Sequence, residues 1–263
     1  MDYIKPNQVV DSLVTAGVAK SQLSVSNILV KAILAGVFLG YATTLAFSAS
    51  VQTGLDVVGA VLFPAGFVMV LLLNLELVTG AFAVLPLSRF RNQITTSSVA
   101  YNLTWSFIGN LAGGIIYAGL YVIYITHFGH VDDSLIIQKI ITVAESKTLD
   151  YKAYGMDGMI VVFVKALLCN FMVALGVVMN ASSTSTIGKI AAMWLPIMIF
   201  FAQSFEHAVV NMFVIPAGML LGADISMADW WVWNQIPVTI GNFISGCIFV
   251  GLALHFITKE KKV

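Results

Sequence analysis

The sequence places ionisable side chains at membrane depth, near the centres of two long apolar stretches, at Glu76, Glu206 and His207. A charged group at membrane depth costs roughly 3 kcal/mol or more unless it is paired, hydrogen-bonded or hydrated. Imidazole changes charge, or exchanges donor and acceptor roles, near neutral pH, so His207 is the first candidate for proton chemistry. Asn170 and Asn211 are placed to hold it in a hydrogen-bonded network. For the two glutamates, capping the ends of half-helices is the competing interpretation.

The apolar composition of the chain predicts which kind of element holds these side chains. Of 263 residues, 59% are hydrophobic and 10% are charged, whereas soluble domains carry roughly 25% charged residues. The composition predicts an all-α membrane protein, and a net charge of zero gives no basic footprint for nucleic acid. Cys169 and Cys247 both lie in apolar runs, so we expect no disulfide, metal or cofactor site.

Six stretches are apolar enough to cross a bilayer, which takes about 20 residues each: 26–49, 57–88, 97–126, 158–182, 188–222 and 234–257. Arg89, Arg91 and Lys189 lie in connections on the same side as the lysine-rich tail, 258–263. The positive-inside rule makes that side cytoplasmic. The sequence therefore predicts a multi-pass inner-membrane protein with both termini in the cytoplasm and an outer loop at 128–157.

The segment 1–24 precedes the first span and holds acidic and polar residues, which argues against a cleavable signal peptide. Pro6 stands at a plausible first helical position. It is followed at helical spacing by apolar residues, namely Val9, Val10, Leu13 and Ala16. This pattern predicts a short amphipathic helix on the cytoplasmic face, with a frayed tail as the alternative.

The two halves of the chain, 26–126 and 158–257, contain an internal repeat. VKAIL at 30–34 matches VKALL at 164–168, and IGN occurs at both 108–110 and 240–242, at offsets of 134 and 132 residues. Each half holds three spans, and an odd number of spans inserts the second copy upside down. We therefore predict one transmembrane channel domain built from two inverted three-helix repeats.

The middle span of each half is over 30 residues long, too long for one straight helix across roughly 30 Å of hydrocarbon. Polar residues interrupt both spans near their centres, at 74–80 and at 203–207. Paired interruptions at equivalent places in inverted halves indicate a binding or conduction site at the midplane of the membrane.

These interruptions resemble motifs of the formate/nitrite transporter family. NLELVTG at 74–80 is similar to the first broken-helix loop of that family. FEH at 205–207, followed by NMF at 211–213 and IPAG at 215–218, is similar to its second. Cys169-Asn170 and IPVTIGN at 236–242 also look like family signatures. The resemblance covers all six spans, and its second-loop motif is highly specific.

The resemblance implies an aquaporin-like protomer with broken second and fifth helices, assembled as a homopentamer with one pore in each subunit. By motif position, Thr79 and His207 would be the central polar pair of the pore. Asn170, Glu206 and Asn211 would lie around them.

The same resemblance implies two hydrophobic constrictions, an outer one from Phe63 and Phe200 and an inner one from Phe67 and Leu77. Ordinary lipid-facing or core positions are the alternative for these side chains. A basic residue at the outer mouth is also implied: Lys147 looks like it, but the chain from Lys147 to Asn170 is longer than in the bacterial formate channels, so Lys152 is a rival. Lys165 is expected to extend to the membrane interface as a helix-end cation.

The function implied by the resemblance is passage of formate or a related small monovalent anion across the lipid bilayer, without enzyme activity. Nitrite and hydrosulfide are open alternatives within the family. An aquaporin-like channel for neutral solutes would suit inverted halves, but the chain lacks paired Asn-Pro-Ala motifs. A membrane redox enzyme would need axial histidines or clustered cysteines within its spans, and this sequence has no such spacing.

Formate is an anion at neutral pH, and a narrow apolar constriction offers no hydrogen bonds to replace its water. The neutral acid passes such a constriction far more easily. We therefore hypothesise that the outer lysine concentrates the anion and that Thr79 and His207 bind it between the constrictions. A proton supplied through His207 then neutralises it for exit.

Overall fold

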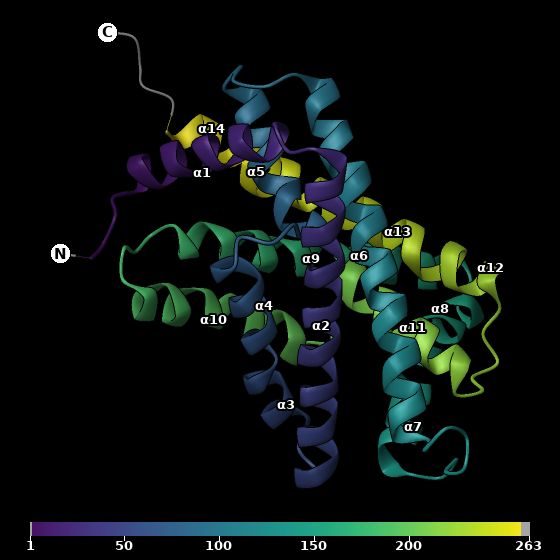
Figure 1. Ribbon diagram of the computed structural model, residues 1–263. Coiled ribbons are helices and arrows are strands. Elements are labelled where there is room, and N and C mark those ends of the chain that lie inside the picture. Colours follow the sequence, from purple (N-terminus) through teal and green to yellow (C-terminus); the bar gives the residue numbers. More distant parts are fainter. Residues whose placement is uncertain (1, 259–263) are drawn as a thin grey trace, which may run out of the picture.

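The computed structural model describes residues 2–258, and in this part the chain is almost entirely helical (Figure 1). Four helical segments are long and apolar enough to cross a membrane: α2 (Val25–Thr53), α6 (Thr96–Ile125), α9 (Met156–Asn180) and the run Met227–Ile257. This last run joins α12 (Met227–Trp230), η1 (Trp231–Gln235), α13 (Ile236–Ile244), η2 (Ser245–Leu252) and α14 (Ala253–Ile257). Apart from Thr258, the predicted tail 258–263 lies outside the described residues.

Shorter apolar helices occupy the two long middle spans of the sequence. The first is divided into α3 (Asp56–Leu62), α4 (Pro64–Leu72) and α5 (Val78–Phe90), and the second into α10 (Thr186–Ala202) and α11 (Ala208–Leu220). The chain leaves α4 and α10 through Asn74 and Ser204, whose φ angles are 50° and 52°. In each case the N–H of the following residue donates back to a carbonyl of the helix, Leu75 to Val70 and Phe205 to Phe200. Both helix ends are therefore closed in the same way.

The N-terminal helix α1 (Pro6–Ser21) lies across one end of the molecule, beside α5 (Figure 1). Its apolar residues Val9, Val10 and Leu13 are buried against Val84 and Leu87 of α5. The predicted helix is thus formed, and three of its four predicted apolar residues pack against protein, whereas Ala16 is exposed.

The segment 128–157, expected to be an outer loop, contains two helices instead: α7 (Leu135–Ser146) and the short α8 (Leu149–Ala153). In α7, Ile137, Ile140 and Ala144 are fully buried, and the helix packs against α11. These three residues share one helical face, so burying them explains why the segment folds as a helix. The sequence predicted this segment only as a connection between two spans, and the structure shows that the connection is itself folded into helices.

Two buried asparagines hydrogen-bond the starts of α5 and α11 to the long helices around them. Asn110 of α6 accepts the Val78 amide at 2.9 Å and donates to two carbonyl oxygens, those of Ala32 at 2.8 Å and Glu76 at 2.9 Å. Asn242 of α13 makes the same three bonds, with Ala208 at 2.9 Å, Ala166 at 2.8 Å and Glu206 at 3.0 Å. Backbone groups at the helix interruptions would otherwise be unpaired in an apolar interior, so these bonds stabilise the breaks.

Candidate functional site

The two interruptions meet at one pair of polar side chains. Thr79, in the first turn of α5, places its Oγ1 atom 2.9 Å from Nε2 of His207, the residue that precedes α11. Both side chains are buried. The N-termini of α5 and α11 therefore face each other, and the partial positive charges of the two helix ends converge on this pair.

Backbone contacts fix the hydrogen-bonding pattern of His207. The Val210 N–H donates to Nδ1 at 3.1 Å, so Nδ1 acts as an acceptor and carries no hydrogen. In the neutral ring the hydrogen is then on Nε2, which donates to Thr79 Oγ1. The Thr79 hydroxyl hydrogen remains available for another acceptor. Within residues 2–258, these two bonds are the hydrogen bonds of the His207 side chain.

Aromatic rings cover the polar pair. The Phe200 ring stacks on His207 with centroids 5.5 Å apart, and Phe63 meets Phe200 edge-on at 5.6 Å. Phe67 and Leu77 belong to the same buried apolar cluster. All four of these side chains are at most 3% exposed, so none lies on the outer surface of the protein. One face of the imidazole thus packs against an apolar ring, within a buried apolar cluster that contains all four of these side chains.

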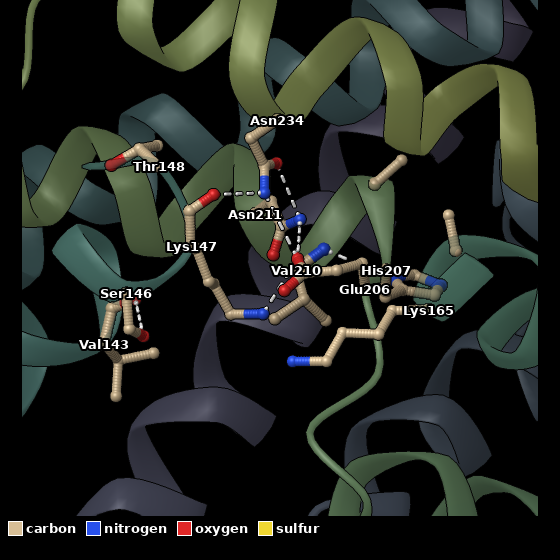
Figure 2. Close-up of polar contacts among 12 residues, drawn as sticks. Val143, Ser146, Lys147, Thr148, Lys165, Glu206, His207, Val210, Asn211 and Asn234 are labelled. Atoms are coloured by element: carbon tan, nitrogen blue, oxygen red, sulfur yellow. Dashed lines mark hydrogen bonds and ion pairs between the residues drawn. The ribbon is translucent and has the colours of Figure 1, made fainter. Parts of the chain in front are cut away.

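Glu206 adjoins His207 in the chain, but its side chain belongs to a separate polar cluster (Figure 2). The carboxylate is 1% exposed and accepts from four donors: Tyr151 Oη at 2.8 Å, Lys147 Nζ at 3.0 Å, Asn211 Nδ2 at 2.8 Å and Asn234 Nδ2 at 3.2 Å. Asn234 also donates to the backbone carbonyl of Lys147 at 2.8 Å. A paired and fully hydrogen-bonded carboxylate is the form in which a charge is tolerated at a buried position.

Glu76 in the first half has a matching set of partners. Its carboxylate is 1% exposed and accepts from Lys20 Nζ at 2.7 Å and from Asn102 Nδ2 at 3.5 Å. Asn102 also donates to the Lys20 backbone carbonyl at 3.0 Å. Lys20 and Asn102 thus repeat the contacts of Lys147 and Asn234. The two halves differ at the residue after the glutamate, which is Leu77 in one and His207 in the other.

A cavity of about 600 Å³ reaches His207. We call it the outer vestibule, because the topology predicted from the sequence puts it on the outer side of the membrane. Lys147, Lys165 and Glu206 all lie in its wall. The rival lysine, Lys152, is half-exposed and donates to Asp229 at 2.8 Å, and it does not line the vestibule. Among the described residues, no group of three His, Cys, Asp or Glu side chains gathers in a way that could hold a metal ion.

The model of the formate/nitrite transporter family matches residues 7–256. The chain belongs to the formate/nitrite transporter family. The resemblance inferred from the loop motifs is therefore confirmed. At the level of the family, the expected class of channel or transporter, as opposed to enzyme, is confirmed as well.

Two relatives of this family member are similar over nearly their full lengths. The chain is 34% identical to the uncharacterized transporter YrhG of Bacillus subtilis (strain 168), covering 100% of this chain and 96% of that protein. It is 30% identical to the formate channel BtFdhC of Bacillus thuringiensis, covering 100% of this chain and 98% of that protein.

Two solved structures share the fold of this formate/nitrite transporter. One is described as an FNT family ion channel, with a TM-score of 0.81 and 23% identity over 96% of this chain and 99% of that chain. The other is a pentameric formate channel with formate bound, with a TM-score of 0.71 and 24% identity over 89% of this chain and 97% of that chain.

The residues expected from the family motifs fall into separate groups. Thr79 and His207 are bonded to each other, whereas Asn211 bonds Glu206 and not His207. Asn170 donates to the Asn242 carbonyl at 2.8 Å and likewise makes no bond to His207. The expectation that these two asparagines hold the imidazole is thus not met by the geometry.

Sequence reasoning missed several members of the polar clusters, namely Lys20, Asn102, Tyr151 and Asn234. Asn102 and Asn234 are separated by 132 residues, the same offset as the matched IGN motifs, so the repeat contained the signal for that pair. Lys165, expected as a helix-end cation at the membrane interface, lines the vestibule and donates to the Tyr151 hydroxyl at 3.2 Å. This partner on α8 was not foreseen from the sequence.

Proposed function

We propose that this formate/nitrite transporter passes formate across the inner membrane as a homopentamer, with one pathway in each subunit. The observation that carries the proposal is the buried Thr79–His207 hydrogen bond where the starts of α5 and α11 meet. The name of the relative BtFdhC, a formate channel, and the pentameric formate channel of similar fold support the choice of substrate and assembly.

The proposed subunit crosses the membrane six times in two inverted three-helix halves, as in an aquaporin-like fold, with both termini in the cytoplasm. Two correspondences support the inverted halves: the equivalent bonds of Asn110 and Asn242, and the equivalent clusters around Glu76 and Glu206. In this arrangement the broken second and fifth crossings place their interruptions back to back.

In the proposed mechanism, Lys147 attracts the anion into the outer vestibule, and Thr79 and His207 bind it between the constrictions. The free hydrogen of the Thr79 hydroxyl donates to an oxygen of the anion, and the opposed helix N-termini stabilise its charge. Phe63 and Phe200 form the outer constriction, and Phe67 and Leu77 the inner one. Such a binding position replaces part of the water that the anion loses.

Proton delivery through His207 has a structural requirement in this mechanism. His207 must first carry a hydrogen on both ring nitrogens, which displaces the Val210 amide from Nδ1. The Nε2 proton then passes to Thr79 Oγ1 while the hydroxyl proton of Thr79 moves to the anion, and the neutral acid leaves. The ring is left neutral with its hydrogen on Nδ1.

Proteoliposomes test the mechanism directly. Replacing His207 with Asn or Phe is expected to abolish pH-dependent formate uptake, because neither side chain carries an exchangeable proton of this kind. Uptake with an unchanged pH profile in both variants would remove the proton relay from the mechanism. Competition among formate, nitrite and hydrosulfide identifies the preferred anion, and stopped-flow water permeation tests the aquaporin-like alternative.

A further inference from the structure

The second half of the chain contains a short insertion that the first half lacks. Lys20 and Lys147, which make equivalent contacts, are 127 residues apart, whereas the matched lysines Lys31 and Lys165 are 134 apart. Seven extra residues therefore lie between Lys147 and Lys165 (134 − 127 = 7). This part of the chain forms α8 and the turn into α9, and it lies at the outer vestibule.

Several contacts fix α8 in position. Lys152 bonds Asp229 of α12 at 2.8 Å, and Gly155 turns the chain into α9 with a φ of 57°. A Cβ atom at Gly158 would overlap the backbone carbonyl of Tyr151, so glycine is what allows α8 to lie directly on α9. The Tyr151 ring is 5% exposed and packs in an apolar cluster with Val162, Ala166, Ala208 and Val238.

The Tyr151 hydroxyl bridges two charged groups of opposite sign. It donates to Oε1 of Glu206 at 2.8 Å and accepts from Nζ of Lys165 at 3.2 Å. Burial and the neighbouring Glu206 raise the pKa of Tyr151, so the hydroxyl keeps its hydrogen and stays a donor. Lys165 also lies over the Tyr151 ring, with Nζ 5.5 Å from the ring centroid.

Lys165 differs from the other two lysines that line the vestibule in its ion pairing. Lys139 is paired with Asp56, and Lys147 with Glu206. Within residues 2–258, no carboxylate oxygen lies within 4 Å of the Lys165 ammonium. Two further carboxylates line the vestibule, Asp150 and Asp157, and both residues are exposed to solvent. Figure 2 shows the ammonium groups of Lys147 and Lys165 directed to the same region beside Glu206.

We propose that Tyr151 is a positioning residue that keeps the Lys165 ammonium in the outer vestibule, where it serves an incoming small anion as a cation that, unlike Lys147, is not paired with Glu206. The Tyr151 hydroxyl lies between the Lys165 ammonium and Oε1 of Glu206: it accepts from the first and donates to the second. Without that hydroxyl, Lys165 moves onto Oε1 and forms a direct ion pair. Its charge is then withdrawn from the anion. The proposal rests on the proposed function and adds a residue pair to its entry step.

The test measures formate uptake against outside concentration in right-side-out membrane vesicles. Lys165→Met is expected to raise the half-saturating concentration about fivefold, the equivalent of about 1 kcal/mol for a charge pair near 4 Å in water. Tyr151→Phe is expected to cause a rise of similar size, while the maximal flux changes little. Since both variants remove the same cation, the double variant is expected to match either single one.

Controls separate this role from simple packing. Tyr154 lies in the same insertion and lines the vestibule, but its hydroxyl makes no hydrogen bond within residues 2–258. The variant Tyr154→Phe is therefore expected to behave as wild type. Lys165→Arg keeps the charge and is expected to retain wild-type half-saturation. The rise in half-saturating concentration of Lys165→Met and Tyr151→Phe is also expected to become smaller as the salt concentration rises, because ions screen exposed charges.

The outcomes distinguish this proposal from the function on which it rests. Wild-type half-saturation in both Tyr151→Phe and Lys165→Met would overturn the proposal, and so would effects that add in the double variant. If Tyr151→Phe fails to assemble, Lys165→Met and Lys165→Arg still decide whether the charge matters. If the wild-type protein shows no formate flux, the proposed substrate is wrong, and the same variants are then scored with nitrite.

Discussion

Replacing Lys147 with Met removes the cation from a buried ion pair. The Lys147 side chain is 13% exposed and its partner Glu206 is 1% exposed, with 3.0 Å between Nζ and Oε2. Breaking a buried pair from one side costs about 3–5 kcal/mol, because the remaining charge is left without compensation. Tyr151, Asn211 and Asn234 still donate to the carboxylate, which favours the lower end of this range. We therefore expect a loss of about 3 kcal/mol.

Thermal unfolding of the purified protein in detergent measures this loss. For a chain of this size, 1 kcal/mol corresponds to about 2–4 °C, so the Tm of Lys147→Met is expected to fall by about 6–12 °C. The double variant Lys147→Met/Glu206→Gln removes the orphaned charge and is expected to recover most of the difference. Lys152→Met is the matched control, since its pair with Asp229 is 52% exposed on the lysine side and is worth about 1 kcal/mol or less.

A Lys147→Met protein as stable as wild type would mean that Glu206 does not depend on the lysine for its charge. A double variant less stable than Lys147→Met would mean that the carboxylate stabilises the fold through contacts other than this ion pair.

Three further predictions concern the pair at the centre, the framework and the insertion. Thr79→Val keeps the shape but removes the hydroxyl, and formate flux in proteoliposomes is expected to fall about tenfold or more, corresponding to about 1.4 kcal/mol for the lost bond. Asn110→Leu and Asn242→Leu each remove three equivalent bonds, so their Tm values are expected to fall by similar amounts; clearly unequal losses would contradict equivalent roles. Gly158→Ala displaces Tyr151 and is expected to raise outside half-saturation as Tyr151→Phe does.

The broken helices were visible in the sequence because polar residues are rare inside apolar runs. Glu76 and His207 each follow such a run, and the structure ends α4 and α10 within a few residues of them. The family motifs also indicated Thr79 and His207 as partners, and the structure places them 2.9 Å apart. Local sequence was sufficient here because the interruption and the chemical group lie in the same short segment.

The partners of Glu206 were harder to predict because they come from four separate elements. Lys147 follows α7, Tyr151 lies in α8, Asn211 in α11 and Asn234 in η1. No periodicity links these positions, and α8 is a five-residue helix whose place depends on the close contact at Gly158. From the sequence, the chain from Lys147 to Asn170 was recognised only as longer than in the bacterial formate channels, and length alone does not say which side chain points inward.

The equivalence of the two halves bears on what determines the direction of transport across the bilayer. The residue before α5 is Leu77 and the residue before α11 is His207, although the asparagine and glutamate contacts around them are repeated. In the proposed inverted arrangement the framework is nearly the same from either face of the bilayer, so it favours neither direction of transport. In the proposed mechanism, net movement therefore follows the gradients of solute and proton. The features that break the equivalence are those present once, the imidazole of His207 and the hydroxyl of Tyr151.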